Sequence, residues 1–243
     1  MNVEIIKCLE DNYSYLIIDS KKNACVVDPS EEGPVIASVE SNQANLKYIL
    51  NTHHHFDHIG GNLNLKKKYN AKVIGYVEDK HRIPGIDIEL KDKEIWNKDG
   101  FSFQVFHIPG HTSGHICFYF KKEKLLFTGD TLFSLGCGRI FEGTHEEMFN
   151  SLNKIKNLPP ETKVYCGHEY TKNNYEFCLE YDKDNTFLKK KKLFIDQKLR
   201  DKSPTIPTTI DDELKTNIFL RCDNESVKKN IGINNASDIL TFK

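Results

Sequence analysis

Short apolar runs separated by turn residues fill the first two thirds of the chain, a pattern typical of a β-rich fold. Runs rich in β-branched and aromatic residues predict strands at 3–9, 13–18, 24–27, 48–50, 72–75, 101–106, 116–120, 125–128 and 163–166. Helical spacing predicts helices at 35–39, 62–69 and 146–157, the first starting near Pro34. Residues 1–170 are therefore expected to form one mixed α/β domain.

The pattern of apolar and polar residues changes after Tyr170, where runs typical of strands become rare. Apolar residues at helical spacing predict helices at 173–181, 186–200 and 211–219. The lysine run Lys189–Lys192 suggests either an anionic partner or the solvated face of a helix. The apolar spacing of Phe187, Leu188 and Phe194 favours the solvated face. We expect a small helical domain over residues 171–243.

Composition narrows the class of protein. The 243 residues carry a net charge of −1, so no overall basic field draws the chain to nucleic acid or to an anionic membrane. No apolar run approaches the ~20 residues that span a bilayer. The seven cysteines are odd in number and form no CxxC, and the start of the chain reads as a strand rather than a secretory signal. These features predict a cytoplasmic protein with reduced thiols.

Thr52 to His58 is the segment richest in potential chemistry. It directly follows a predicted strand and offers His53, His55, Asp57 and His58 in six positions. If this segment is extended, residues two apart point the same way, so His53 and His55 can hold one metal ion. Asp57 and His58 can then reach a second ion beside it. Imidazole and carboxylate ligands suit zinc, and also iron or manganese.

Three more candidate ligands stand at the ends of predicted strands, each beside glycine. They are His111 in Pro-Gly-His-Thr-Ser-Gly-His, Asp130 in Thr-Gly-Asp-Thr and His168 in Cys-Gly-His-Glu. Glycine allows the sharp turns and close backbone approach that a crowded metal site needs. Four such segments predict one metal centre at a sheet edge.

His53-x-His55-x-Asp57-His58, followed by His111, Asp130 and His168, resembles the ligand series of the metallo-β-lactamase superfamily. The strings at 136–139 and 166–171, Gly-Cys-Gly-Arg and Cys-Gly-His-Glu-Tyr-Thr, resemble the hydroxyacylglutathione hydrolases (glyoxalase II) within it. Similar strings span most of residues 11–171. The resemblance implies an α+β fold, with an αββα sandwich in residues 1–170 and a helical substrate-binding domain in residues 171–243.

The resemblance also implies roles for the ligands. His53, His55 and His111 would hold metal one, and Asp57, His58 and His168 would hold metal two. Asp130 would bridge two divalent ions, with a water or hydroxide as the other bridge. Zinc is the expected metal, with iron or manganese as alternatives. Asp57 and Asp130 are the expected catalytic carboxylates.

The reaction implied is hydrolysis of S-2-hydroxyacylglutathione thioesters by the metal-bound hydroxide. S-D-lactoylglutathione would give D-lactate and glutathione, which detoxifies methylglyoxal, and the enzyme is expected to act as a monomer. A thiolate with a parent pKa near ~8.5 leaves with little protonation, so a dedicated general acid is not required. Arg139, Phe141, Tyr170 and Lys243 are the expected substrate contacts. Phe141 stands where the family usually has tyrosine, and Lys243 stands alone where relatives have a basic pair.

Other residues near these motifs are expected to be structural. They are His54, His81, His107, His115, His145, Cys137, Cys166 and Trp96. Asp28 has two equal interpretations: a carboxylate that fixes a histidine tautomer behind the metals, or a turn cap beside Pro29.

Two other functions remain open from the sequence. A glutathione persulfide dioxygenase of the same superfamily would use one iron and oxygen. A metal-holding, glutathione-binding protein without turnover would release no thiol from a thioester, so an assay for thiol release separates it from a hydrolase.

Overall fold

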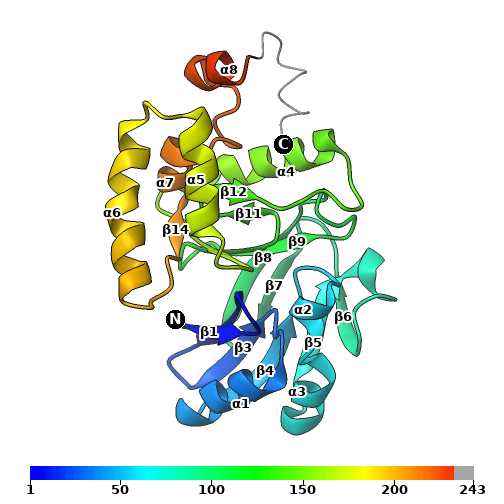
Figure 1. Ribbon diagram of the computed structural model, residues 1–243. Helices are drawn as coiled ribbons and strands as arrows, with labels where there is room; N and C mark the ends of the chain where they lie inside the picture. Colours follow the sequence, from blue (N-terminus) through cyan, green and yellow to red (C-terminus); the bar gives the residue numbers. More distant parts are fainter. Residues whose placement is uncertain (233–243) are drawn as a thin grey trace. The chain divides into compact units, whose positions relative to one another are not determined.

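The computed structural model describes residues 1–232 (Figure 1). The chain divides into two compact units. The first unit comprises Met1–His107 and Gly114–Gly129. The second comprises Ile108–Ser113 and the chain from Asp130 onward. No helix within residues 1–232 is long and apolar enough to cross a membrane.

A six-stranded sheet opens the first unit, in the order β1-β2-β3-β4-β5-β6. The strands β1 to β3 are antiparallel neighbours, and β3 to β6 are parallel. The helices α1 and α3 lie in the connections between parallel strands, as a crossover requires. The bounds are β1 (Asn2–Cys8), β2 (Asn12–Ile18), β3 (Asn23–Val27), α1 (Glu32–Ser41), β4 (Asn45–Leu50), α2 (Phe56–Ile59), α3 (Asn62–Tyr69), β5 (Lys72–Tyr76), the 3-10 turn η1 (Val77–Asp79) and β6 (Ile86–Leu90).

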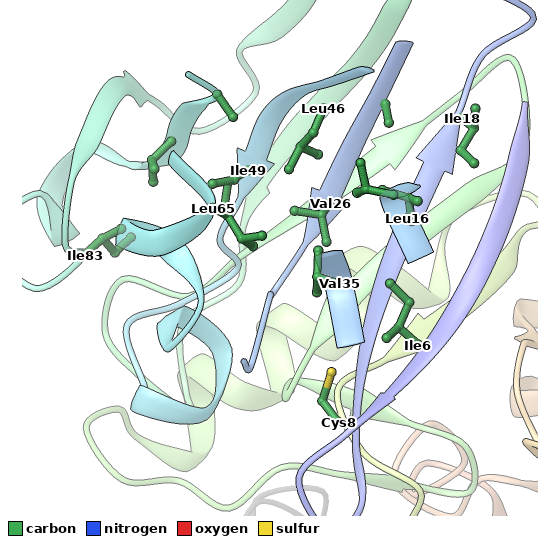
Figure 2. Packing of buried hydrophobic residues seen from close by; sticks show 14 residues of the cluster. Ile6, Cys8, Leu16, Ile18, Val26, Val35, Leu46, Ile49, Leu65 and Ile83 are labelled. Carbon is green, nitrogen blue, oxygen red and sulfur yellow. The ribbon is translucent and has the colours of Figure 1, made fainter. Parts of the chain in front are cut away.

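One face of this sheet packs against α1 and α3. Figure 2 shows Val35 of α1 and Leu65 of α3 meeting Leu16, Val26 and Ile49 of the strands. All five side chains are fully buried. Alternate strand residues point to one face of a sheet, so this cluster uses every second residue of β2 and β3.

The opposite face packs against a second, antiparallel set of strands. These are β7 (Ile95–Lys98), β8 (Phe101–His107), β9 (Ile116–Phe120) and β10 (Leu125–Gly129). The rings of Tyr15 and Phe127 lie 5.4 Å apart, and those of Tyr48 and Phe101 lie 6.3 Å apart. Because both faces of the first sheet are covered, every residue of β2 is buried.

The second unit is mainly helical. Leu135 packs with Tyr175, Cys178, Leu188 and Ile195 in a core of its own. The elements are β11 (Leu132–Phe133), β12 (Gly136–Cys137), α4 (His145–Lys156), β13 (Lys163–Cys166), α5 (Thr171–Tyr181), α6 (Thr186–Arg200), β14 (Thr208–Thr209), α7 (Ile210–Thr216) and α8 (Glu225–Ile231).

The structure confirms the nine predicted strands and six predicted helices, with shifted ends. Pro34 lies in the first turn of α1 rather than at its start, and α7 ends at Thr216, short of Phe219. The helix α7 ends because Asn217 adopts an extended backbone, with φ −83° and ψ 113°, and its side-chain amide donates to the carbonyl of Gly136 at 3.0 Å. The strands β6, β7, β11, β12 and β14 were not predicted, although Ile86, Ile88 and Leu90 of β6 alternate as a strand does.

Candidate metal centre

The first unit positions four of the predicted ligands directly after β4. The chain turns at Asn51, whose side-chain amide donates to the carbonyl of His58 at 3.0 Å. The expectation of an extended segment up to His58 is wrong at its end. Phe56–Ile59 form the short helix α2, so Asp57 and His58 project from a helical turn.

Asp28 fixes the imidazole of His58. Its Oδ2 lies 3.0 Å from His58 Nδ1, and both side chains are buried. The carboxylate can only accept, so Nδ1 carries the proton and Nε2 keeps its lone pair. A lone pair at Nε2 is what a metal ion requires.

Asp28 fixes His53 in the same way, through one intermediate hydroxyl. Thr52 Oγ1 donates to Asp28 Oδ2 at 2.7 Å and lies 3.0 Å from His53 Nδ1. Since the hydroxyl proton goes to the carboxylate, Thr52 accepts from Nδ1–H of His53 and leaves Nε2 as the ligand atom. Asp28, His53 and His58 bring potential ligand atoms within 4.8 Å of one another. The contacts favour the tautomer-fixing interpretation of Asp28, whose backbone φ is +47°.

Asp57 is held by an asparagine from β2. Asn12 Nδ2 donates to Asp57 Oδ2 at 2.9 Å and to its carbonyl at 3.2 Å. The same carboxylate oxygen lies 3.6 Å from His58 Nε2. The two groups therefore face a common point, as two ligands of one ion do.

Three other histidines of the first unit make contacts that suit a structural role. His115 is fully buried, and its ring stacks on that of His53 with centroids 4.6 Å apart. His54 lies 3.3 Å from the carboxylate of Asp79. His107 stacks on Tyr76 at 4.6 Å.

The second unit holds the other three predicted ligands close together. Asp130 Oδ2 lies 3.5 Å from His111 Nε2 and 3.2 Å from His168 Nε2. His111 Nδ1 donates to the carbonyl of Arg139 at 2.8 Å, which again leaves Nε2 with the lone pair. Gly138 is required here, because a Cβ at that position would collide with the backbone of Asp130.

The donor set fits a divalent transition metal. Imidazole nitrogens and carboxylate oxygens are good ligands for such ions, and the histidines with an assigned proton present Nε2. These groups are largely buried. A buried carboxylate and imidazole lone pairs that face one another are stabilised when a cation lies between them, because the cation pairs with the buried charge.

The predicted substrate contacts lie in the second unit, apart from Lys243, which lies outside the described residues. Arg139 is exposed and lines a cavity of about 650 Å³. The ring of exposed Phe141 lies 5.2 Å from that of His111. Tyr170 stacks on His168 at 4.7 Å, with an interplanar angle of 5°.

The sequence did not indicate most of that cavity. Asn173, Asn174 and Phe177 of α5 line it, together with Met148 of α4 and Phe219. Asparagine and phenylalanine at these positions look like ordinary helix residues, so only the folded chain shows that they meet Arg139.

Cys166 is a buried, protonated thiol rather than a nucleophile. Burial raises the pKa of the Cys166 thiol to about 12. Its Sγ donates to the carbonyl of His168 at 3.4 Å. A protonated, buried thiol is a packing group, as predicted.

Family models match residues 9–243 in two parts. Residues 9–168 match the metallo-beta-lactamase superfamily, and residues 169–243 match the hydroxyacylglutathione hydrolase C-terminus. Among curated proteins, the hydroxyacylglutathione hydrolase of Pelagibacter ubique is 62% identical over 93% of this chain and 95% of its own length. That of Methylococcus capsulatus is 42% identical over 98% of this chain and 93% of its own length.

Solved structures show the same fold. The BLEG-1 B3 metallo-beta-lactamase is 26% identical, with a TM-score of 0.71 over 90% of this chain and 99% of its own. ETHE1 from Myxococcus xanthus is 29% identical, with a TM-score of 0.63 over 70% and 76%. TTHA1623, solved in a di-iron-bound form, is 27% identical, with a TM-score of 0.57 over 69% and 92%. The expected α+β metallo-β-lactamase fold with a helical C-terminal region is confirmed.

Proposed function

Because the chain belongs to the metallo-β-lactamase superfamily and, within it, to the hydroxyacylglutathione hydrolases, we propose that it hydrolyses S-2-hydroxyacylglutathione thioesters. S-D-lactoylglutathione gives D-lactate and glutathione, a step that detoxifies methylglyoxal. The observation that carries this proposal is the 62% identity to a hydroxyacylglutathione hydrolase over 93% of the chain.

The proposal assigns the seven expected ligands to two metal ions per chain. His53, His55 and His111 would hold metal one, Asp57, His58 and His168 would hold metal two, and Asp130 would be shared between them. Two ions per chain are supported by the seven-ligand series and by the di-iron form of the related TTHA1623. Zinc is the proposed metal, with iron or manganese as alternatives, because imidazole and carboxylate accept all three.

Two divalent ions would lower the pKa of a shared water and polarise the thioester carbonyl. The chain's own residues prepare for this chemistry. Asp28 and Thr52 keep the histidine protons on Nδ1, and Asn12 orients the carboxylate of Asp57. The Asp130 carboxylate would supply negative charge to the bound cations. The leaving thiolate needs little protonation, so no general acid is assigned.

Glutathione is proposed to bind against Arg139, Phe141 and Tyr170, with Lys243 as a further contact. The cavity that Arg139 lines has about 650 Å³, within the usual range for small-molecule sites. An exposed guanidinium suits a peptide carboxylate, and the apolar wall at Phe177 suits the carbon skeleton.

We further propose that residues 1–170 act as the hydrolase domain and residues 171–243 as the substrate-binding domain. All seven proposed ligands come from one chain, which supports a monomeric enzyme. The seven cysteines form no disulfide within residues 1–232, which supports a reducing compartment such as the cytoplasm.

Thiol release from S-D-lactoylglutathione, measured together with metal content per chain, tests the proposal. We expect turnover with about two ions bound. A protein that takes up metal but releases no thiol would be a binding protein instead. Oxygen consumption with glutathione persulfide tests the dioxygenase alternative, which the names of the curated relatives do not favour.

A further inference from the structure

A buried carboxylate lies beside the ligand segment of the first unit and is absent from the proposed ligand set. Asp79, the last residue of η1, is fully buried. Its Oδ1 accepts hydrogen bonds from Nε of Arg82, at 3.0 Å, and from Nη2 of the same guanidinium. Burying a carboxylate is costly unless it is paired, so this guanidinium is what permits the charge here.

The Asp79–Arg82 pair contacts both ring nitrogens of His54. Asp79 Oδ2 lies 3.3 Å from Nδ1, and Arg82 Nη1 lies 3.4 Å from Nε2. His54 stands between the proposed ligands His53 and His55 in the sequence. Holding this ring therefore fixes the backbone from which both ligands project.

Asp79 also supports the segment on the other side of His53. A side chain at Gly114 would collide with the Asp79 carboxylate, so the two pack directly against each other. Gly114 precedes His115, whose ring stacks on that of His53 at 4.6 Å. One carboxylate thus contacts both segments that flank the His53 ring.

We propose that Asp79 and Arg82 are positioning residues for the metal centre and that they act through His54. The inference rests on the proposed function only for the roles of His53 and His55 as ligands. Removing hydrogen-bonded partners behind a ligand commonly lowers metal affinity by about 10–100-fold. Since Arg82 acts through further residues, the expected loss is at the lower end, about tenfold.

Zinc affinity, measured by competition with a chelator, tests the role in Arg82→Ala, Asp79→Asn and His54→Ala. Each should bind zinc about tenfold more weakly than wild type. The double variant Arg82→Ala/His54→Ala should bind no more weakly than either single variant, because both break the same link. Arg82→Lys keeps one charge but not the two-pronged geometry, and should recover part of the affinity. Lys80→Ala is the matched control, since Lys80 is exposed and lies 4.0 Å from Glu89.

A cooperative unfolding transition of each metal-free variant shows that the variant folds. Folded Arg82→Ala and His54→Ala proteins with zinc affinity within twofold of wild type would overturn the inference, as would fully additive losses in the double variant. If Asp79→Asn does not fold, His54→Ala and Arg82→Lys still decide the question. Turnover is separate: with saturating zinc, thiol release by Arg82→Lys should return to near the wild-type rate. A wild-type protein that binds zinc without releasing thiol would contradict the proposed function and leave the affinity comparison intact.

Discussion

At the scale of single residues, the proposed centre depends on which nitrogen of each histidine holds its proton. Asp28, Thr52 and the carbonyl of Arg139 each face an Nδ1, so the protons are placed before any metal arrives. Preorganised ligands lose less freedom when an ion binds, which favours tight binding. The Asp130 carboxylate lies beside two of the proposed histidine ligands, so metal binding should be sensitive to its removal.

We expect Asp130→Ala to lose bound metal and nearly all thiol release. Its carboxylate lies within 3.5 Å of His111 Nε2 and 3.2 Å of His168 Nε2, so the change removes the proposed bridge between two cations. Metal analysis and turnover should be measured on the same preparation. Asp223→Ala is a suitable control, because that side chain is exposed and its carboxylate lies 3.1 Å from Lys156 Nζ. Full activity in Asp130→Ala would contradict the assignment.

Arg139→Ala should weaken substrate binding and spare the metals. A hydrogen bond to a charged group is worth roughly 1.5–3 kcal/mol, so KM for S-D-lactoylglutathione should rise about tenfold or more. The backbone carbonyl that accepts from His111 Nδ1 is kept in the variant, so metal content should not change. Arg200→Ala on α6 serves as the control. An unchanged KM would remove Arg139 from the substrate site.

At the scale of elements, α4 supports the turn that bears His111. Its Ser151 donates to the carbonyl of Pro109 at 2.7 Å, and its Met148 packs against Gly110. The helix starts with a capping box, in which Thr144 Oγ1 accepts from the backbone N–H of Glu147 and the Glu147 side chain accepts from Thr144. Such reciprocal bonds satisfy two otherwise unpaired N–H groups.

Thr144→Ala should therefore lower the free energy of unfolding by about 1 kcal/mol. Denaturant unfolding measures the loss, and Thr144→Ser, which keeps the hydroxyl, should lie near wild type. If the alanine variant unfolds at the wild-type denaturant concentration, the cap contributes nothing to stability.

The ligand series could be predicted from sequence because each member sits in a short motif at a strand end. His53 and Asp57 are four residues apart, and His111, Asp130 and His168 each stand beside glycine or a turn. The surroundings could not be predicted in this way. The sequence around Asp79 does not indicate its contact with His54, which is 25 residues away. That contact forms only after β4 and β5 pair.

At the scale of the whole molecule, stability should fall in alkaline solution. Burial raises the pKa of the Cys178 thiol from 9.0 to about 12. The folded chain keeps this proton more tightly than the unfolded chain, so the stabilisation is complete below pH 9 and is lost as pH rises toward 12. Above pH 9 this one group should reduce stability by up to about 1.4 kcal/mol per pH unit.

Urea unfolding of wild type and Cys178→Ala between pH 8 and roughly 10.5 tests this expectation, because the thiol of the unfolded chain loses its proton over about this pH range. The variant has lost the titrating thiol and should show a shallower decline. Other buried thiols contribute equally to both proteins. Parallel declines would show that Cys178 does not govern this dependence.

The burial of the thiols has a further consequence, for a cell under oxidative stress. Oxidised glutathione transfers a glutathionyl group only to an accessible thiolate, and six of the seven cysteines are buried, Cys137 being the exception. Any loss of rate as the glutathione pool shifts toward the disulfide should therefore come from Cys137, which lines the same cavity as Arg139. Intact-mass spectra after incubation with oxidised glutathione should show at most one added tripeptide, at Cys137.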